Sequence, residues 1–337
     1  MYYSQLSTPV SIHPFLYHYQ CSYSYLPVKT NSLVSSDLTT NTTFAAAALE
    51  EYKQSKLGPY TSPTGEFLEF LPLTTYSNAS AQIHAAALKQ NSATYLPATT
   101  PAEVQKGYAQ EFRILNEKLL SDKSASLEII WADGVVLLGL QHPYSRGSVE
   151  TLTSNVFDGV TVDSGYLRNP LDVKLLSEGV RFARKLAATA AVKELQPLEV
   201  VPGANVTSDA ALEQYARSNS QTFYHPAGSC KMGARELGGV VDSKLSVYGV
   251  TGLRVADASV IPLLPATHLM TTVYAIAEKV GNCHCLSVIT VLLTMQSRRP
   301  ILSSKDELCQ YSRELFGEVV AGEVSACSSI LKQCSML

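Results

Sequence analysis

The chain has 337 residues, of which 46% are hydrophobic and 16% are charged, and its formal net charge is −3. This composition is typical of a globular protein with one large domain or two small ones. The slightly acidic balance gives no electrostatic reason to bind nucleic acid. The longest apolar run near either end, Leu286–Met295, is too short to span a bilayer. We therefore expect no nucleic-acid partner and no membrane.

The two ends differ in composition from the middle. Six of the 18 tyrosines fall within the first 25 residues, and five of the seven cysteines follow Asn282 in spacings that match no zinc pattern. The first 20 residues lack the basic and apolar regions of a signal peptide, which predicts a cytoplasmic location by default. Three N-x-S/T sequons suit a secreted ancestor, at Asn41, Asn78 and Asn205. We expect residues 1–30 and 283–337 to be poorly ordered.

Between these ends, helical and strand patterns alternate. Phe44–Lys53 is rich in helix formers, and Thr100–Glu103 has the spacing of a capping box that opens a helix to about Leu120. Apolar and β-branched residues predict further elements: a hairpin over Leu127–Leu140 that turns at Asp133-Gly134, a strand over Gly147–Thr153, an amphipathic helix over Leu171–Ala191, short strands over Val240–Val247 and Leu253–Ala256, and a helix that begins near His268. The mixture predicts an α+β fold or one part of an α/β protein.

Several motifs are missing from the sequence. No two of the 19 glycines stand two residues apart, so there is no G-x-G-x-x-G dinucleotide-binding turn. There is also no P-loop, no G-x-S-x-G nucleophile elbow and no H-E-x-x-H zinc motif. On these motifs alone, the sequence predicts neither a nucleotide site nor a hydrolase.

Three segments in a fixed order are the most informative part of the chain. They are YHPAGSCKMG at Tyr224–Gly233, GGVVDSKLSVYGVTGLRVADASVIP at Gly238–Pro262 and PATHLMTTVYAIAEKVG at Pro265–Gly281. Together they resemble the C-terminal signature of the glucose–methanol–choline oxidoreductases, a family of FAD-dependent alcohol oxidoreductases. HPYSRGSVE at His142–Glu150 fits the same family in the same order. The resemblance implies a substrate-domain sheet with flanking helices together with a C-terminal segment of an FAD-binding domain.

Two histidines carry the chemistry that the resemblance implies. The family places a histidine of the HP-x-G segment over the reactive edge of the flavin and pairs it with a second histidine or asparagine. Here these positions are His225 and, 43 residues later, His268. Imidazole titrates near neutrality, which suits a group that removes a hydroxyl proton while hydride leaves for flavin N5. We expect His225 to be the base and His268 to orient the alcohol. A lone histidine before proline is otherwise most often a loop or core residue, and the pair lacks ligands for a metal site.

The resemblance also implies flavin contacts. The helix that begins near His268 would direct its free N–H groups toward the pyrimidine edge of the flavin, through His268, Leu269 and Met270. The turn at Asp257-Ala258 would approach the diphosphate side. The alternative for Asp257 is a cap of its own turn, because Asp-Ala-Ser is a common turn sequence.

The missing glycine-rich turn bears on activity. In the family it binds the ADP portion near the N-terminus of the enzyme. We therefore interpret residues 31–215 as a partial substrate-binding domain, 216–282 as a C-terminal segment of the FAD-binding domain, and the chain as truncated at the N-terminal FAD-binding motif. Three functions stay open: an FAD-dependent oxidoreductase of primary alcohols, an inactive remnant or mispredicted gene product, and a non-catalytic half that needs a partner chain. The small-molecule alcohol, the electron acceptor and the oligomeric state are not readable; fungal specialised metabolism is the context that the resemblance implies.

Overall fold

The computed structural model describes residues 11–12, 19–27, 37–61, 67–132, 135–194 and 196–281. The predicted tail of residues 283–337 and the hairpin turn at residues 133–134 lie outside the described residues. The chain divides into two compact units, Met1–Leu269 and Met270–Leu337. The described residues of the second unit, 270–281, form a helix, which agrees with the helix predicted to begin near His268. All other elements belong to the first unit.

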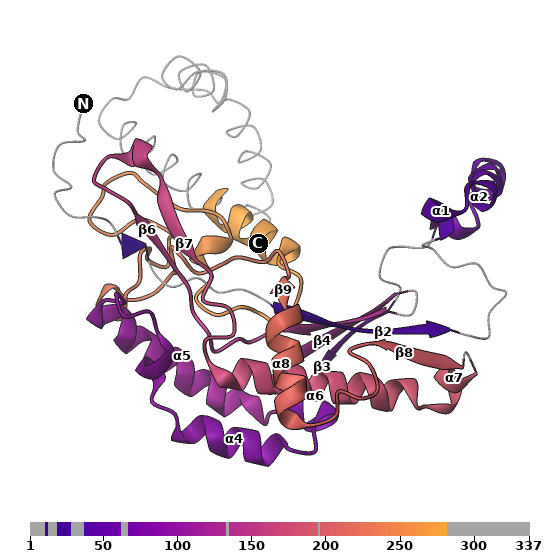
Figure 1. Cartoon of the computed structure of the whole chain (residues 1–337). Helices are drawn as coiled ribbons and strands as arrows, with labels where there is room; N and C mark the ends of the chain where they lie inside the picture. Colours follow the sequence, from indigo (N-terminus) through magenta and orange to yellow (C-terminus); the bar gives the residue numbers. More distant parts are fainter. Residues whose placement is uncertain are drawn as a thin grey trace, which may run out of the picture. The chain divides into compact units, whose positions relative to one another are not determined.

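A six-stranded antiparallel sheet forms the centre of the first unit (Figure 1). Its main path runs in the order β3-β4-β5-β2-β8, and a short β9 pairs with β2. The strands are β2 (Tyr19–Pro27), β3 (Phe67–Leu71), β4 (Leu127–Ala132), β5 (Val135–Leu140), β8 (Pro197–Val201) and β9 (Gln221–Thr222). β4 and β5 pair from Leu127↔Leu140 to Ala132↔Val135, which confirms the predicted hairpin.

β2 is the main difference from the sequence-based expectation. Residues 19–27 were expected to be poorly ordered, yet β2 lies between β5 and β8 and its backbone pairs with both. The segment alternates aromatic or apolar residues with Gln and Ser, as in Tyr19-Gln20-Cys21-Ser22-Tyr23. This two-residue period is that of a strand, and the surrounding tyrosine-rich composition obscured it.

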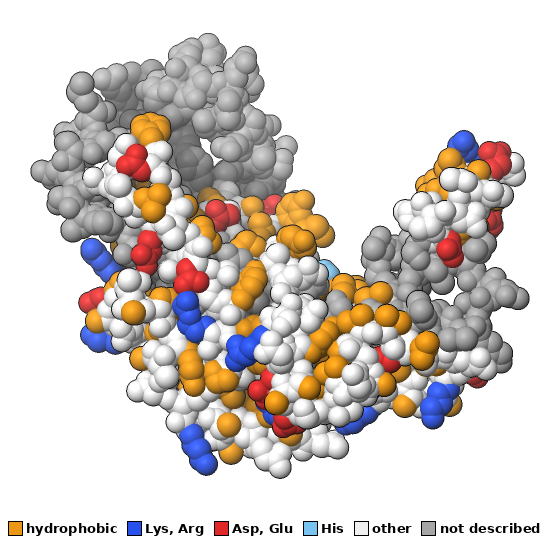
Figure 2. All heavy atoms as spheres, in the orientation of Figure 1, with side chains coloured by type: hydrophobic (Ala, Val, Ile, Leu, Met, Phe, Trp, Pro, Cys, Tyr) orange, Lys and Arg blue, Asp and Glu red, His pale blue; other side chains and the backbone are white. Residues whose placement is uncertain are grey.

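A second, three-stranded sheet has the order β1-β6-β7. It consists of β1 (Ser11–Ile12), β6 (Ser148–Thr151) and β7 (Val160–Asp163), and a short 3₁₀ helix η3 (Val156–Asp158) lies between the last two. Figure 2 shows hydrophobic side chains on the surface of the first unit. In the β6–β7 hairpin, Phe157 is 92% exposed and Val162 is also exposed. An exposed apolar group of this kind marks a surface that associates with other protein or ligand surfaces in many proteins.

The helices are α1 (Asp37–Thr40), α2 (Thr42–Ser55), α3 (Leu73–Tyr76), α4 (Ser80–Lys89), α5 (Ala102–Leu119), α6 (Pro170–Ala187), α7 (Ala190–Lys193) and α8 (Asp209–Asn219), with 3₁₀ turns η1 (Pro59–Thr61), η2 (Ser92–Tyr95), η4 (Arg235–Leu237) and η5 (Ala258–Val260). α6 lies along one face of the central sheet, α4 packs against α5 and α6, and α8 packs against α6 (Figure 1). Among the described residues, no helix is both long enough and apolar enough to cross a membrane.

The buried stripe of α6 closes the core against the sheet. Val173, Leu176, Val180 and Ala183 recur at intervals of three and four residues, and all are buried, as the amphipathic pattern predicted. Gly179 lets this helix approach the sheet closely, because an added Cβ would lie 3.1 Å from Leu127 of β4. Mixed helices and sheet confirm the expected fold class.

Two local predictions were wrong in detail. The N-cap position of helix α5 is Pro101, without a side-chain cap, and the Thr100 hydroxyl donates instead to Pro97 O and closes the preceding turn. The strands expected over 240–256 form only isolated bridges, at Met232↔Val241, Val241↔Val247 and Ser246↔Arg254. Gly249 and Gly252 adopt positive φ there and turn the chain before a ladder can extend.

Candidate active site

His225 is placed by a segment that runs alongside η5. Its neighbour Tyr224 has a φ of 59° and donates its N–H to the hydroxyl of Thr222, so the chain turns sharply out of β9. The following residues are tied to η5 by backbone hydrogen bonds from Cys230 to Ser259 (2.9 Å) and from Met232 to Val260 (2.8 Å). The position of His225 is therefore fixed by backbone pairing on both sides of its turn.

The same segment is anchored to α5 through charge. Lys231 Nζ lies 2.8 Å from Glu111 Oε1, and Arg146 Nη2 lies 3.3 Å from Glu111 Oε2. All three side chains are at most 13% exposed. Arg146 also covers the ring of Tyr108, 4.7 Å from its centroid. A carboxylate shared by two buried cations holds the His225 segment against the helix.

His268 stands on the central sheet. Its Nε2 lies 2.6 Å from Oε1 of Glu128, a β4 residue with no exposed surface. Gln141, just after β5, donates from Nε2 to the other oxygen of Glu128 at 2.9 Å. The loop that leads to His268 is fixed by the half-buried His142, whose ring hydrogen-bonds the backbone of Leu264. The contact with the buried carboxyl group of Glu128 thus fixes the orientation of the His268 ring.

The rings of the two histidines converge. Their ring centroids lie 5.5 Å apart, with an interplanar angle of 59°. The Phe223 ring contacts both, at 5.6 Å from His225 and 6.0 Å from His268, and Phe70 of β3 lies 6.4 Å from His268. The side chain of His268 is 46% exposed, so the pair opens to the surface. Two imidazoles with an aromatic wall are therefore available to one small molecule.

The surroundings of His225 and Glu128 shift the pKa values of these two groups in opposite directions. Burial, and then positive charge on His268, lower the pKa of His225 below 6.5, which favours its neutral, basic form. Burial raises the pKa of Glu128, while the charge and hydrogen bond of His268 and the hydrogen bond of Gln141 act in the opposite direction. Within the described part of the chain, no group of three His, Cys, Asp or Glu side chains could hold a metal ion.

The other predicted cofactor contacts lie in two places. Asp257 caps η5 by accepting the N–H of Ser259 at 2.8 Å, which is the turn-capping role, and Ala258 O accepts the N–H of Gly228 in the His225 segment. The side chain of Leu269 is buried at 5% exposure, so only its backbone could address a ligand. Met270 is 69% exposed and begins the helix of residues 270–281.

Glu128, Gln141 and Phe223 were not among the predicted site residues. A signal for Glu128 existed, because it is a charged residue inside the otherwise apolar run Leu127–Ala132. No local pattern could show that His268, 140 residues later, would lie on it. Gln141 and Phe223 carried no comparable signal.

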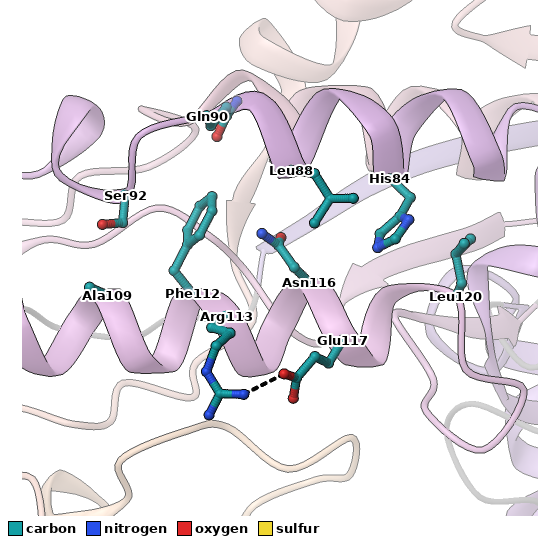
Figure 3. Close-up of a pocket in the computed structure, with 10 residues that line it drawn as sticks. All are labelled: His84, Leu88, Gln90, Ser92, Ala109, Phe112, Arg113, Asn116, Glu117 and Leu120. Atoms are coloured by element: carbon teal, nitrogen blue, oxygen red, sulfur yellow. Dashed lines mark hydrogen bonds and ion pairs between the residues drawn. The ribbon is translucent and has the colours of Figure 1, made fainter.

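A cavity of about 510 Å³ lies away from the histidine pair, between α4 and α5 (Figure 3). Its walls combine apolar side chains such as Leu88 and Phe112 with polar ones. Several of these polar groups are engaged with neighbours: Arg113 with Glu117, and Asn116 with the hydroxyl of Tyr144. The lining of this cavity does not contain a pair of histidines, unlike the site formed by His225 and His268.

The chain is similar in sequence and in fold to known oxidoreductases. Residues 143–277 match the family model for the C-terminal region of the GMC oxidoreductases. The chain is 32% identical to patulin synthase of Aspergillus clavatus over 261 residues, which are 76% of this chain and 40% of that protein. Its fold is similar to that of an FAD-dependent oxidoreductase from Chaetomium thermophilum, with a TM-score of 0.77 and 27% identity over 81% of this chain and 48% of that one.

A fungal aryl-alcohol oxidase is similar as well, with a TM-score of 0.71 and 33% identity over 80% of this chain and 47% of that one. The chain thus spans half or less of the length of these relatives. FAD is the cofactor of the family and of its structural neighbours, as the resemblance implied. Residues 143–277 thus belong to the C-terminal domain of the GMC oxidoreductase family, and the chain is similar to FAD-dependent members of that family over most of its length.

Proposed function

We propose that this chain provides the acid–base half of the active site of an FAD-dependent oxidoreductase that oxidises a primary alcohol. The observation that carries the proposal is the pairing of His225 with His268, 5.5 Å apart, above the buried Glu128. Structural histidines seldom combine convergent rings, a lowered pKa and partial exposure, and this combination marks functional sites.

The residues present fit one edge of a flavin. Two imidazoles lie together with an open side, as a substrate held between base and cofactor requires. His225, His268 and the backbone of Leu269 are the groups that would face FAD and the alcohol. The sequence has no glycine-rich turn for the diphosphate, so that part of the cofactor would depend on contacts outside the described residues. FAD, when bound, supplies the acceptor for the hydride of the alcohol.

The protein groups then have distinct tasks. Because burial lowers the pKa of His225, its ring is neutral near pH 7 and can take the hydroxyl proton. His268 uses Nε2 for Glu128, which leaves Nδ1 to hydrogen-bond the substrate oxygen and hold it near His225. Phe223 excludes water from both rings and restrains their relative orientation.

The substrate is proposed only as a class. The relatives include proteins named patulin synthase and aryl-alcohol oxidase. For this chain we propose, correspondingly, a tailoring oxidation of a small primary alcohol in fungal specialised metabolism. A second candidate is a non-catalytic half that requires a partner chain; the observation that favours it is the lack of a G-x-G-x-x-G turn for the FAD diphosphate within this sequence.

The test combines cofactor binding with single-turnover kinetics. The full chain is purified alone and together with a separately expressed FAD-binding half of a relative, and bound flavin is measured by its absorbance spectrum. Anaerobic flavin reduction is then followed with a panel of primary alcohols. His225→Ala should slow reduction by about 10²- to 10⁴-fold, the usual effect of losing a general base. His268→Asn should be milder, because asparagine can still hydrogen-bond the substrate.

The matched control is His84→Asn, a histidine of the cavity between α4 and α5, which should leave the rate unchanged. Equal reduction rates for the unmodified chain and His225→Ala would refute the assignment of the base. If flavin binds only when the second half is present, the partner-dependent candidate is supported. Rapid turnover by the chain alone would exclude that candidate.

A further inference from the structure

Gln141 holds an unusual position beneath the histidine pair. Its side chain has no exposed surface, and its Nε2 donates to Glu128 Oε2 at 2.9 Å. A weaker contact of 3.4 Å joins Nε2 to Gly139 O. Its Oε1, in contrast, is buried and has no hydrogen-bond partner among the described residues.

An unsatisfied buried acceptor needs a physical reason. Leaving such an atom without a partner costs about 1–3 kcal/mol, and an apolar side chain of similar size would avoid that cost. Turning the amide around would not help, because its oxygen would then face the carboxylate of Glu128. The hydrogen bond that the amide does make is from Nε2 to Glu128, and it lowers the pKa of that carboxyl group against the larger effect of burial.

The ionisation of Glu128 decides where a proton of the pair resides. An ionised Oε1 accepts a hydrogen bond from a protonated Nε2 of His268, in a neutral ring as well as in a cationic one. A neutral Glu128 would itself donate to Nε2, which would then carry no proton. The two arrangements differ in whether the shared proton resides on Glu128 or on Nε2 of His268.

We propose that Gln141 is a positioning residue that keeps the proton shared by Glu128 and His268 on Nε2 of His268. The inference rests on the proposed function, because it assigns Nδ1 of His268 to the substrate oxygen. With Nε2 held by Glu128, the ring is fixed in one orientation and Nδ1 is directed at that oxygen.

The surroundings of the pair leave few competing charges. Within the described part of the chain, His225 is the titratable side chain whose ring faces His268. Phe70 from β3 and Phe223 present only aromatic rings to it. Among the described residues, Gln141, just after β5, is the other group that hydrogen-bonds the Glu128 carboxyl. A substitution at Gln141 should therefore change the pH at which Glu128 ionises.

Nuclear magnetic resonance of the full chain, labelled with ¹³C and ¹⁵N, tests the proposal without FAD or alcohol. The Glu128 Cδ shift reports carboxyl ionisation, and the His268 Nε2 shift reports whether that nitrogen carries a proton. In the unmodified chain we expect an ionised Glu128 and a protonated Nε2 throughout the range in which the pair holds one proton. In Gln141→Met, the Glu128 midpoint should move to higher pH and Nε2 should lose its proton in that range.

The matched control is Tyr76→Phe, which removes a buried hydroxyl bonded to Ser126 at 3.0 Å and does not touch Glu128. It should leave both signals in place. If Gln141→Met does not fold, Gln141→Asn withdraws the same donor by one methylene. Unchanged signals in these variants would overturn the proposal, and so would a neutral Glu128 beside an unprotonated Nε2 in the unmodified chain. Because flavin is absent, failure here leaves the oxidoreductase proposal standing, and failed flavin reduction leaves this one standing.

Discussion

The rings of His225 and His268 meet with their centroids 5.5 Å apart, although the residues lie on separate segments joined by 43 residues. Each is fixed by different means: His225 by a backbone segment paired with η5, and His268 by the carboxyl group of Glu128 on β4. The distance between the two rings therefore depends on how the His225 segment contacts the sheet, and on the side chains that pack between the segment and the sheet.

The first prediction concerns the pH dependence of the base. Burial lowers the pKa of His225 below 6.5, so its neutral form persists to lower pH than that of a solvated histidine. In the assembled enzyme, flavin reduction should fall as the pH is lowered through a midpoint below 6.5. Stopped-flow measurement of anaerobic reduction between about pH 5 and 8 checks this. Phe223→Ala, which exposes the ring, should move the midpoint upward; a midpoint above 6.5 in the unmodified enzyme contradicts the prediction.

The second prediction concerns Gly139, which gives the Phe223 ring its space. A Cβ at this position would lie 3.1 Å from Cε2 and 3.3 Å from Cζ of Phe223. Gly139→Ala should displace the ring by a few tenths of an ångström and shift the imidazole proton resonances of both histidines. Gly139→Val should lower the free energy of unfolding by about 1–3 kcal/mol through overpacking. Gly233→Ala, where the nearest atom is 4.0 Å away, is the control and should leave the resonances unchanged.

The third prediction separates two roles of Asp257. As the cap of η5 it accepts the N–H of Ser259, and Asp257→Ala should lower the free energy of unfolding by about 0.5–2 kcal/mol. Asp257→Asn keeps an acceptor oxygen and removes the charge, so it should preserve stability. If the carboxylate also contacts the cofactor, Asp257→Asn will change the FAD dissociation constant in the assembled enzyme. Fluorescence titration of flavin binding decides the second role, and an unaltered constant excludes it.

The fourth prediction concerns the anchor of the His225 segment. Glu111→Gln removes the carboxylate shared by Lys231 and Arg146 and leaves two buried cations without a counter-charge. The free energy of unfolding should fall by about 3–5 kcal/mol. Urea denaturation can be followed by the fluorescence of Trp131, the single tryptophan, which lies on β4. Glu117→Gln, in the exposed pair with Arg113, is the control and should change stability by less than about 1 kcal/mol.

The fifth prediction concerns Asp172, which accepts the backbone N–H groups of Tyr144 and Ser145 at 2.7 Å each. Burial raises the pKa of Asp172 from 3.8 to about 6, against the opposing hydrogen bonds. A raised pKa means that ionisation costs the folded state more than the unfolded state. The stabilisation is present below about pH 4 and is lost as the pH rises through 6, by about 3 kcal/mol in all.

The comparison variant for this fifth prediction is Asp172→Asn. The difference in unfolding free energy between the unmodified chain and this variant should decrease between about pH 4 and 6 and then stay constant. Urea titrations at pH values across this range measure it. A difference that grows with pH would show that the two backbone N–H groups outweigh burial and hold the carboxyl ionised.

Local patterns in the sequence were sufficient for the elements whose evidence is periodic. The β4–β5 hairpin follows from two apolar runs around a turn, and the buried stripe of α6 follows from its 3.6-residue spacing. The hairpin and the stripe depend on residues close in sequence, so the sequence by itself determined them. The histidine pair was predicted from the resemblance of two segments to the GMC oxidoreductases, and the tertiary structure brings those rings together.

Tertiary structure decided the rest, because it depends on contacts between distant residues. The insertion of Tyr19–Pro27 between β5 and β8 requires hydrogen bonds to segments more than 100 residues away, which no local pattern can specify. The same holds for Glu128: a carboxyl group is tolerated inside a sheet only when donors meet it, and its donors come from Gln141 and His268. The sequence determined which side chains could do acid–base chemistry, and burial against particular partners decided their protonation and orientation.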